Sequence, residues 1–247
     1  MVVCSTLGPG VAAQSLSISD IVGRMEGAQE QSRSQFTAHS ITREYQLASH
    51  NGQKPESHVT AVINSFAPAA MDFTVRKTAG NDRGEKIVQR MLEHERQMRA
   101  HPELGRISWR NYGFALIGHD TVNGHDCYVL QLQPKRQSIE LIRGKAWVSS
   151  DDFVIRKIEG EPARSPSWWL KDLHLTINYG VEHSMWTQLG IVAVAAVRLA
   201  GTYVLTSRQV EFVTSTQVAW SGPSRSRPAR RSNAQPSVAV NAMPFVQ

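Results

Sequence analysis

Two runs of strand-forming residues meet at Asn123-Gly124 in the segment IGHDTVNGHDCYVLQLQPK, which covers residues 117–135. Asn-Gly is the strongest short-range signal for a two-residue β-hairpin, because both turn positions need positive φ. Strand-like residues precede the pair over 111–120 and follow it over 125–133. The segment therefore predicts an antiparallel hairpin, from which the rest of the chain can be placed.

Further strand-like runs and two helical segments lie on either side of this hairpin. After it, the polar turn Ser149-Ser150-Asp151-Asp152 separates the first two of four predicted strands, which cover 138–148, 153–161, 168–179 and part of 187–220. Before it, Ser17 to Asp20 resembles a capping box and opens a helix. The predicted elements there are helices over 18–32 and 82–101 and strands over 35–47, 58–66 and 69–77. The order is helix, three strands, helix, then six or seven strands, so the class is α+β with one large antiparallel sheet.

Several predicted strands are apolar on both faces, which a sheet with one solvated face does not need. The clearest case is the run Leu189 to Val197, whose nine residues are too few for a membrane span of roughly 20 residues. One face of the sheet can pack on the two helices. The other face needs a second layer, a partner or a lipid, or is simply buried by loops.

The two ends of the chain differ from its middle in composition. The 247 residues carry 27 basic and 21 acidic side chains, a net charge of +6, of which four positive charges come from arginines in the Ser- and Pro-rich segment 221–247. We expect this basic tail to be disordered, because it has too few large apolar residues to offset the entropy of ordering. Residues 1–15 carry no charge and resemble the second half of a signal peptide that lacks its cationic start. The expected domain is 16–220, with Cys127 its one cysteine.

Motifs for catalysis or metal binding are scarce. No phosphate loop, nucleophile elbow, Cys-x-x-Cys or dinucleotide fingerprint occurs. His94-Glu95-Arg96-Gln97-Met98 has Met where a zinc helix needs its second histidine, and His101 is about 10 Å further along the helix. In the predicted hairpin, His119 and His125 point to opposite faces, which disfavours a metal site. Glu159 and Glu161, about 6.6 Å apart on one strand face, leave a hydrolase as a weaker hypothesis.

A family resemblance rests on residues 117–135 together with GKAWVSSDDFVIRKIEGEP, residues 144–162. The order of an Asn-Gly hairpin, a Trp-Val strand, an acidic turn and an Ile-Arg strand resembles the outer-membrane lipoprotein-sorting proteins of the LolA/LolB-like superfamily. SPSWW at 165–169 and the later Trp186 resemble an uncharacterised secreted subgroup of it. The resemblance covers about 117–180. It implies an unclosed half-barrel whose concave face is covered by the two amphipathic helices, with a hydrophobic cavity for acyl chains.

What the resemblance implies about function is carriage without bond chemistry. We therefore expect a periplasmic, monomeric carrier of lipid or acylated protein that is not an enzyme, has no cofactor or metal, and binds no nucleic acid. An inner- or outer-membrane protein is a possible partner, and the alternative is an envelope sensor or interaction module on the same scaffold. The run Leu189 to Val197 departs from the family pattern, so no family binding residues are carried over. The candidate lipid-binding residues are the large aromatics Phe73, Phe114, Trp147, Trp168 and Trp169.

Overall fold

The described part of the chain, residues 16–50 and 55–214 of the computed structural model, forms one ten-stranded sheet and two α-helices. The predicted signal peptide and basic tail lie outside the described residues. In chain order the elements are α1 (Ile18–Ser34), β1 (His39–Ser49), β2 (Ser57–Ala67), β3 (Ala70–Gly80), α2 (Asp82–Ala100), the short 3-10 helix η1 (Pro102–Leu104), β4 (Tyr112–Val122), β5 (His125–Pro134), β6 (Ile142–Ser149), β7 (Ile155–Pro162), β8 (Leu170–Glu182), β9 (Met185–Val197) and β10 (Gly201–Thr214).

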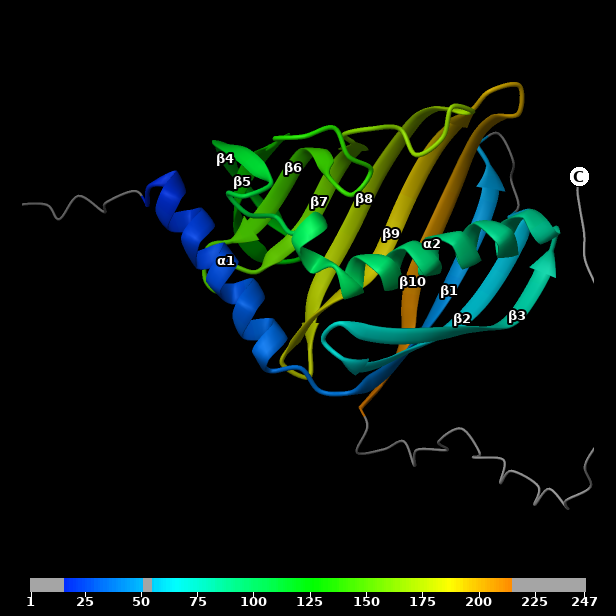
Figure 1. Cartoon of the computed structure of the whole chain (residues 1–247), viewed down its shortest axis with the longest axis horizontal. Coiled ribbons are helices and arrows are strands. Elements are labelled where there is room, and N and C mark those ends of the chain that lie inside the picture. The colour runs from blue at the N-terminus through cyan, green and yellow to red at the C-terminus, as the bar shows by residue number, and fades with distance from the viewer. Residues whose placement is uncertain (1–15, 51–54, 215–247) are drawn as a thin grey trace, which may run out of the picture.

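The sheet is antiparallel and open, with the strand order β3-β2-β1-β10-β9-β8-β7-β6-β5-β4. Consecutive strands pair within β1 to β3 and within β4 to β10, whereas β3 and β4 form the two edges of the sheet. Strand β1 pairs with β10 and so joins the first three strands to the last seven. The sheet curves around the helices, which lie on its concave side (Figure 1). The predicted α+β class with an unclosed half-barrel and two helices on the concave face is confirmed.

Most predicted elements recur, with boundaries that differ by up to four residues. The count of six or seven strands after the second helix is settled at seven, because segment 187–220 holds most of β9, a turn and the described length of β10. Leu199 and Gly201 adopt positive φ values of 64° and 87°, and this backbone conformation reverses the chain between β9 and β10. The predicted capping box is confirmed: the Asp20 amide donates to Ser17 Oγ, and the Ser17 amide donates to Asp20 Oδ2.

Two apolar clusters lie on the concave side, one beneath each helix. Ile21, Val22 and Met25 of α1 are fully buried against β4 to β7, and Val88 and Leu92 of α2 are buried against β1 and β2. Burying each such side chain contributes about 1.5–3 kcal/mol. Leu175 contacts the α2 cluster and Ile177, two residues along β8, contacts the α1 cluster, so both clusters lie on the same sheet face.

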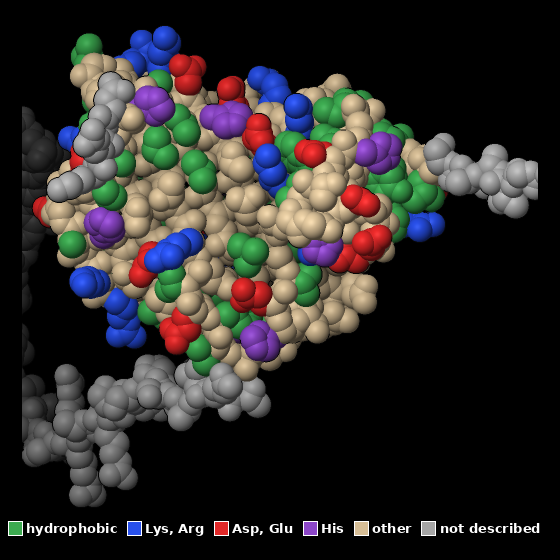
Figure 2. All heavy atoms as spheres, turned by 180° about the vertical axis from the view of Figure 1, so that it is seen from behind, with side chains coloured by type: hydrophobic (Ala, Val, Ile, Leu, Met, Phe, Trp, Pro, Cys, Tyr) green, Lys and Arg blue, Asp and Glu red, His purple; other side chains and the backbone are tan. Residues whose placement is uncertain are grey.

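The opposite face of the sheet has a smaller cluster of its own, formed by Cys127, Val129 and Trp147. Elsewhere on this side, hydrophobic side chains stand in small groups among charged ones (Figure 2). Val192 of β9, for example, is 37% exposed. The apolar run Leu189 to Val197 thus lies in β9, a strand inside the sheet, and its convex side is partly solvated.

Candidate functional site

A strip of apolar side chains on strands β8 to β10 lies between the two helices on the concave face. Helix α2 packs on β1, β2 and β3, whereas α1 packs against β4 and β9 (Figure 1). Here we call Leu173, Leu175, Ile191 and Tyr203 the central strip; each is only partly buried. Strand register places Leu173 opposite Ala195, which is in turn opposite Tyr203. The strip is thus a continuous apolar surface that neither helix fully covers.

A buried ion-pair cluster lies beside the strip, where α2 crosses the sheet. Arg43 of β1 donates to Glu95 of α2 over 2.7 Å, and Arg99, one helical turn later, lies 3.6 Å from the same carboxylate. Arg99 also donates to Ser65 Oγ at 2.6 Å. Burial raises the pKa of Glu95, but Arg43 and Arg99 together hold it below its usual range. Glu95 is therefore a structural carboxylate in its ionised form.

Unpartnered polar atoms lie at this end of the strip. In the described ranges, four buried side-chain atoms have no hydrogen-bond partner, and three of them are Arg43 Nε, Gln188 Nε2 and Gln209 Oε1. Arg43 is directly opposite Gln209 in the register, and Gln188 is opposite Tyr179. The Gln209 amide nitrogen donates to Glu182, so only its oxygen is unpaired. Because an unpaired buried polar group costs about 1–3 kcal/mol, these three atoms mark a place suited to a polar ligand group.

The five aromatic residues predicted to bind lipid are not gathered at one place. Phe73 packs with the α2 cluster and Phe114 with the α1 cluster, where it meets Trp109 edge to face at 4.9 Å. Trp147 lies on the opposite face of the sheet, because its neighbours Ala146 and Val148 both belong to the α1 cluster. Trp168 and Trp169 precede β8 and are 84% and 37% exposed.

Trp147 has a structural environment of its own. Its indole Nε1 donates to Asp120 at 2.9 Å, and the Lys157 ammonium lies 4.1 Å from its ring centroid. The hydrogen bond from the indole lowers the pKa of Asp120. These contacts satisfy the indole on the convex side of the sheet, away from the central strip.

An open groove of about 880 Å³ runs between α2 and the edge strand β3. Phe73 and Val75 form its apolar floor, but the helix side is charged and polar: its lining includes Glu85, Lys86, Gln89, Arg90, Glu93, His94 and Gln97. The mixture of signs and the openness to solvent suit a solvated helix flank better than an acyl-chain tunnel.

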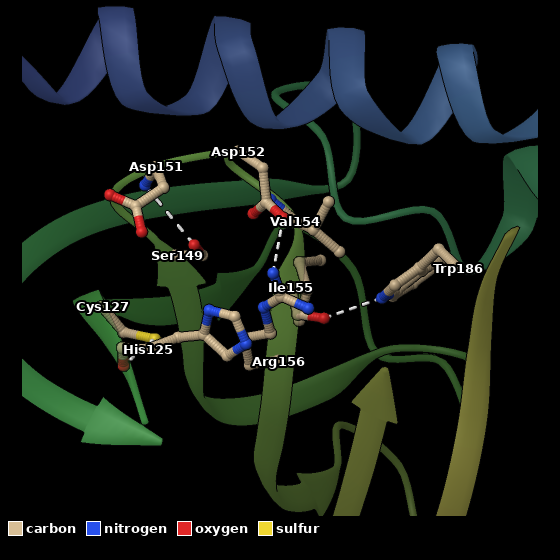
Figure 3. A network of polar contacts seen from close by, with 9 residues as sticks. All are labelled: His125, Cys127, Ser149, Asp151, Asp152, Val154, Ile155, Arg156 and Trp186. Carbon is tan, nitrogen blue, oxygen red and sulfur yellow. Dashed lines mark hydrogen bonds and ion pairs between the residues drawn. The ribbon is translucent and has the colours of Figure 1, made fainter. Parts of the chain in front are cut away.

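The turn between β6 and β7 holds a local polar network (Figure 3). Asp152 accepts from the Val154 amide at 3.1 Å and pairs with Arg156, and the Trp186 indole donates to the Ile155 carbonyl at 2.7 Å. Cys127 donates its thiol to the His125 carbonyl, and burial raises its pKa, so the thiolate needed of a nucleophile is disfavoured. The network fixes a turn and two strands and forms no catalytic arrangement.

The histidines of the hairpin and the carboxylate Glu159, singled out in the sequence, each have their own surroundings. The hairpin register pairs Val122 with His125 and His119 with Tyr128, as expected. Glu159 is ion-paired with Lys157 at 2.7 Å, and that hydrogen bond lowers its pKa. Within residues 16–50 and 55–214, no group of three or more His, Cys, Asp or Glu is placed to hold a metal ion. Over the same residues, neither helix is long and apolar enough to cross a bilayer.

The residues with unpartnered polar atoms beside the central strip were not predicted from the sequence. Arg43, Gln188 and Gln209 belong to three strands and match no motif, since nothing local shows that these strands are neighbours. A weak signal existed in the strand alternation. Arg43, for example, is a polar residue at a position that should face the core, because Ile41 and Tyr45, two residues to either side, are both buried.

No protein-family model matches the chain, and no curated protein matches its sequence. Among solved structures, the chain is similar to a LolA superfamily protein from Nitrosomonas europaea (10% identity, 81% of this chain and 94% of that chain, TM-score 0.43). It is also similar to a DUF1329 family protein from Desulfovibrio piger, with 13% identity over 81% of this chain and 92% of that chain and a TM-score of 0.40. A putative outer membrane lipoprotein-sorting protein domain from Vibrio parahaemolyticus matches with 12% identity over 78% of this chain and 92% of that chain and a TM-score of 0.41. The chain is thus similar to solved LolA-like structures, in line with the resemblance in its sequence, and at these identities and TM-scores the similarity carries nothing about ligand or partner.

Proposed function

We propose that this protein is a periplasmic carrier that binds lipid or lipoprotein acyl chains on the concave face of its sheet and carries out no bond chemistry. The observation that carries the proposal is the central strip: apolar side chains left only partly buried between two helices, with unpartnered polar atoms at one end. Aliphatic surface that a monomer leaves open is a common property of ligand-binding sites.

The dimensions and polarity of the strip match an amphiphile. From Leu173 to Tyr179, β8 advances about 20 Å at about 3.3 Å per residue. One acyl chain spans half of the roughly 30 Å hydrocarbon core of a bilayer, about 15 Å. An acyl chain therefore fits along the aliphatic part and leaves its polar group beside Gln188, Gln209 and Arg43, whose free donors and acceptor match an ester or amide.

The absence of bond chemistry in this proposal is supported by the placement of the titratable groups. Glu95 and Glu159 are held in ion pairs, and the Cys127 thiol is buried with a raised pKa. None of these groups sits with a base and an oxyanion donor as acyl transfer requires. The periplasmic location rests on the expected export signal in residues 1–15.

Binding of a dansyl-labelled fatty acid by the full chain tests the proposal. Ile191→Gln removes an aliphatic side chain from the strip, and we expect the affinity to fall roughly tenfold, because burying such a side chain contributes about 1.5–3 kcal/mol. The matched control is Val192→Gln, the next residue on the same strand, whose side chain points to the opposite face. The control is expected to bind as the wild type does.

Equal affinities for the two variants, or no binding by the wild type, would contradict the proposal. In a second experiment, native mass spectrometry of the protein purified from its own cell envelope identifies the class of bound cargo. Co-purified lipid or acylated peptide near one per chain supports a carrier. A clean mass from a protein that also ignores added lipid would instead favour the sensor or interaction module.

A further inference from the structure

Two loops meet at the end of the sheet where the central strip is most apolar. One is the segment before β8 that ends in Trp168 and Trp169, and the other is the turn between β9 and β10. The Arg198 amide donates to the Trp169 carbonyl at 2.9 Å, and Arg198 Nε donates to the Trp168 carbonyl at 3.0 Å. These bonds hold the loops side by side at a projecting corner of the molecule (Figure 1).

Three large apolar side chains project from this corner; we call Trp168, Trp169 and Leu199 the tip. Trp168 is 84% exposed, Trp169 37%, and Leu199 fully exposed. Leu199 also has a φ of 64°, a left-handed conformation that is costly for a bulky residue. The fold thus holds apolar side chains out in water and strains the backbone at one of them, which is typical of a functional contact.

Basic side chains surround the tip. Arg164, Lys171 and Arg198 are exposed and lie within four residues of a tip residue in the chain, as does one exposed acid, Asp172. Tryptophan with flanking Lys and Arg is the combination found at membrane interfaces, where the rings lie at headgroup level and the cations meet anionic lipids. The size also favours a membrane, because three side chains bury far less than the roughly 1,000 Å² expected of a specific protein interface.

The tip is continuous with the apolar surface inside the molecule. Leu170, the first residue of β8, pairs with Val197 of β9. Further along the same strands, Leu173 of the central strip pairs with Ala195, and Ala195 pairs with Tyr203. A bilayer touching the tip would therefore meet the aliphatic end of the strip, with its polar end furthest away.

We propose that Trp168, Trp169 and Leu199 form a membrane-docking tip, which inserts into the interface of an anionic bilayer while Arg164, Lys171 and Arg198 contact its headgroups. The inference adds an interaction surface to the proposed carrier and does not depend on it, since docking is measured on vesicles and carriage on a free fatty acid.

Co-sedimentation of the full chain with vesicles of phosphatidylglycerol and phosphatidylethanolamine tests the tip. We expect Trp168→Ser/Leu199→Ser to lower vesicle affinity at least roughly 30-fold, because two apolar side chains no longer leave water. Val192→Ser, an exposed apolar residue on the convex face, is the matched control and is expected to bind normally. Pure phosphatidylcholine vesicles are expected to bind the wild type less well than anionic ones.

The basic segment 221–247 is the rival source of vesicle binding, so a second variant replaces Arg225, Arg227, Arg230 and Arg231 with Ser. Binding that survives the tip variant but is lost in this one would overturn the proposal, as would a wild type that ignores vesicles. Fatty-acid binding by the tip variant is expected to be unchanged. That readout separates failure of the tip from failure of the carrier.

Discussion

Arg43 of β1 and Glu95 of α2 form an ion pair of 2.7 Å that ties the helix to the sheet at the polar end of the central strip. The Arg43 side chain is 3% exposed and that of Glu95 27%. A pair so deeply placed is costly to break on one side, because the remaining charge stays buried. The pair therefore adds a polar link between α2 and β1 to the apolar contacts of the helix.

Replacing Glu95 with Ala is expected to destabilise the protein by about 3 kcal/mol, within the range for one-sided loss of a buried pair. The matched control is Glu93→Ala on the same helix, where Glu93 pairs with Arg96 in the open. Exposed pairs contribute little, so the control is expected to lose less than about 1 kcal/mol. Urea unfolding of both variants measures the difference, and equal losses would refute a special role for Glu95.

The same pair predicts a loss of stability in acid. Because the two arginines outweigh burial and depress the folded-state pKa of Glu95 below the ordinary value of 4.5, its stabilisation is complete above that pH. It is lost as the pH falls through the folded-state pKa. The gap in urea midpoint between the wild type and Glu95→Gln should shrink below about pH 4.5. A gap that stays constant down to pH 3 would show that Glu95 keeps an ordinary pKa.

Replacing Trp147 and Trp168 in turn should distinguish a tryptophan that stabilises the fold from one that does not. Trp147→Ala removes a nearly buried ring and its bond to Asp120, and we expect a loss of about 3–5 kcal/mol. Trp168→Ala removes a largely exposed ring and is expected to change the free energy of unfolding by less than about 0.5 kcal/mol. Thermal unfolding of the two variants checks this. If Trp147→Ala were harmless to stability, a binding role for Trp147 would regain weight.

Gly144 and Gly160 face each other across β6 and β7 at a close approach of the two backbones. A Cβ on Gly144 would lie 2.0 Å from the Glu159 carbonyl oxygen, so Gly144→Ala is expected to destabilise the protein by several kcal/mol or prevent folding. Gly23→Ala is the control, because a Cβ there meets nothing within 4 Å on α1. The control should gain about 0.5–1 kcal/mol. The yield of folded protein and its urea midpoint measure both.

Much of this architecture could be predicted because its signals are local. Asn123-Gly124 specifies its turn through positive φ, and that turn sets the register of Val122 with His125. Ser17 and Asp20 mark the start of α1 through bonds three residues apart. Helical and alternating spacing then gave the order of elements, although the apolar run after Leu189 hid the turn at Leu199, where no polar residue pair marks the reversal.

The sequence by itself thus determined the elements, their order and the antiparallel class, because these depend on residues close in the chain. Only the tertiary structure decided that β1 pairs with β10, that Trp147 faces away from the helices, and that Arg43 lies opposite Gln209. Strands that are apolar on both faces do not reveal which face is concave. Nor does any local pattern encode a contact between residues more than 100 positions apart, since such pairing is selected by the packing of the whole sheet.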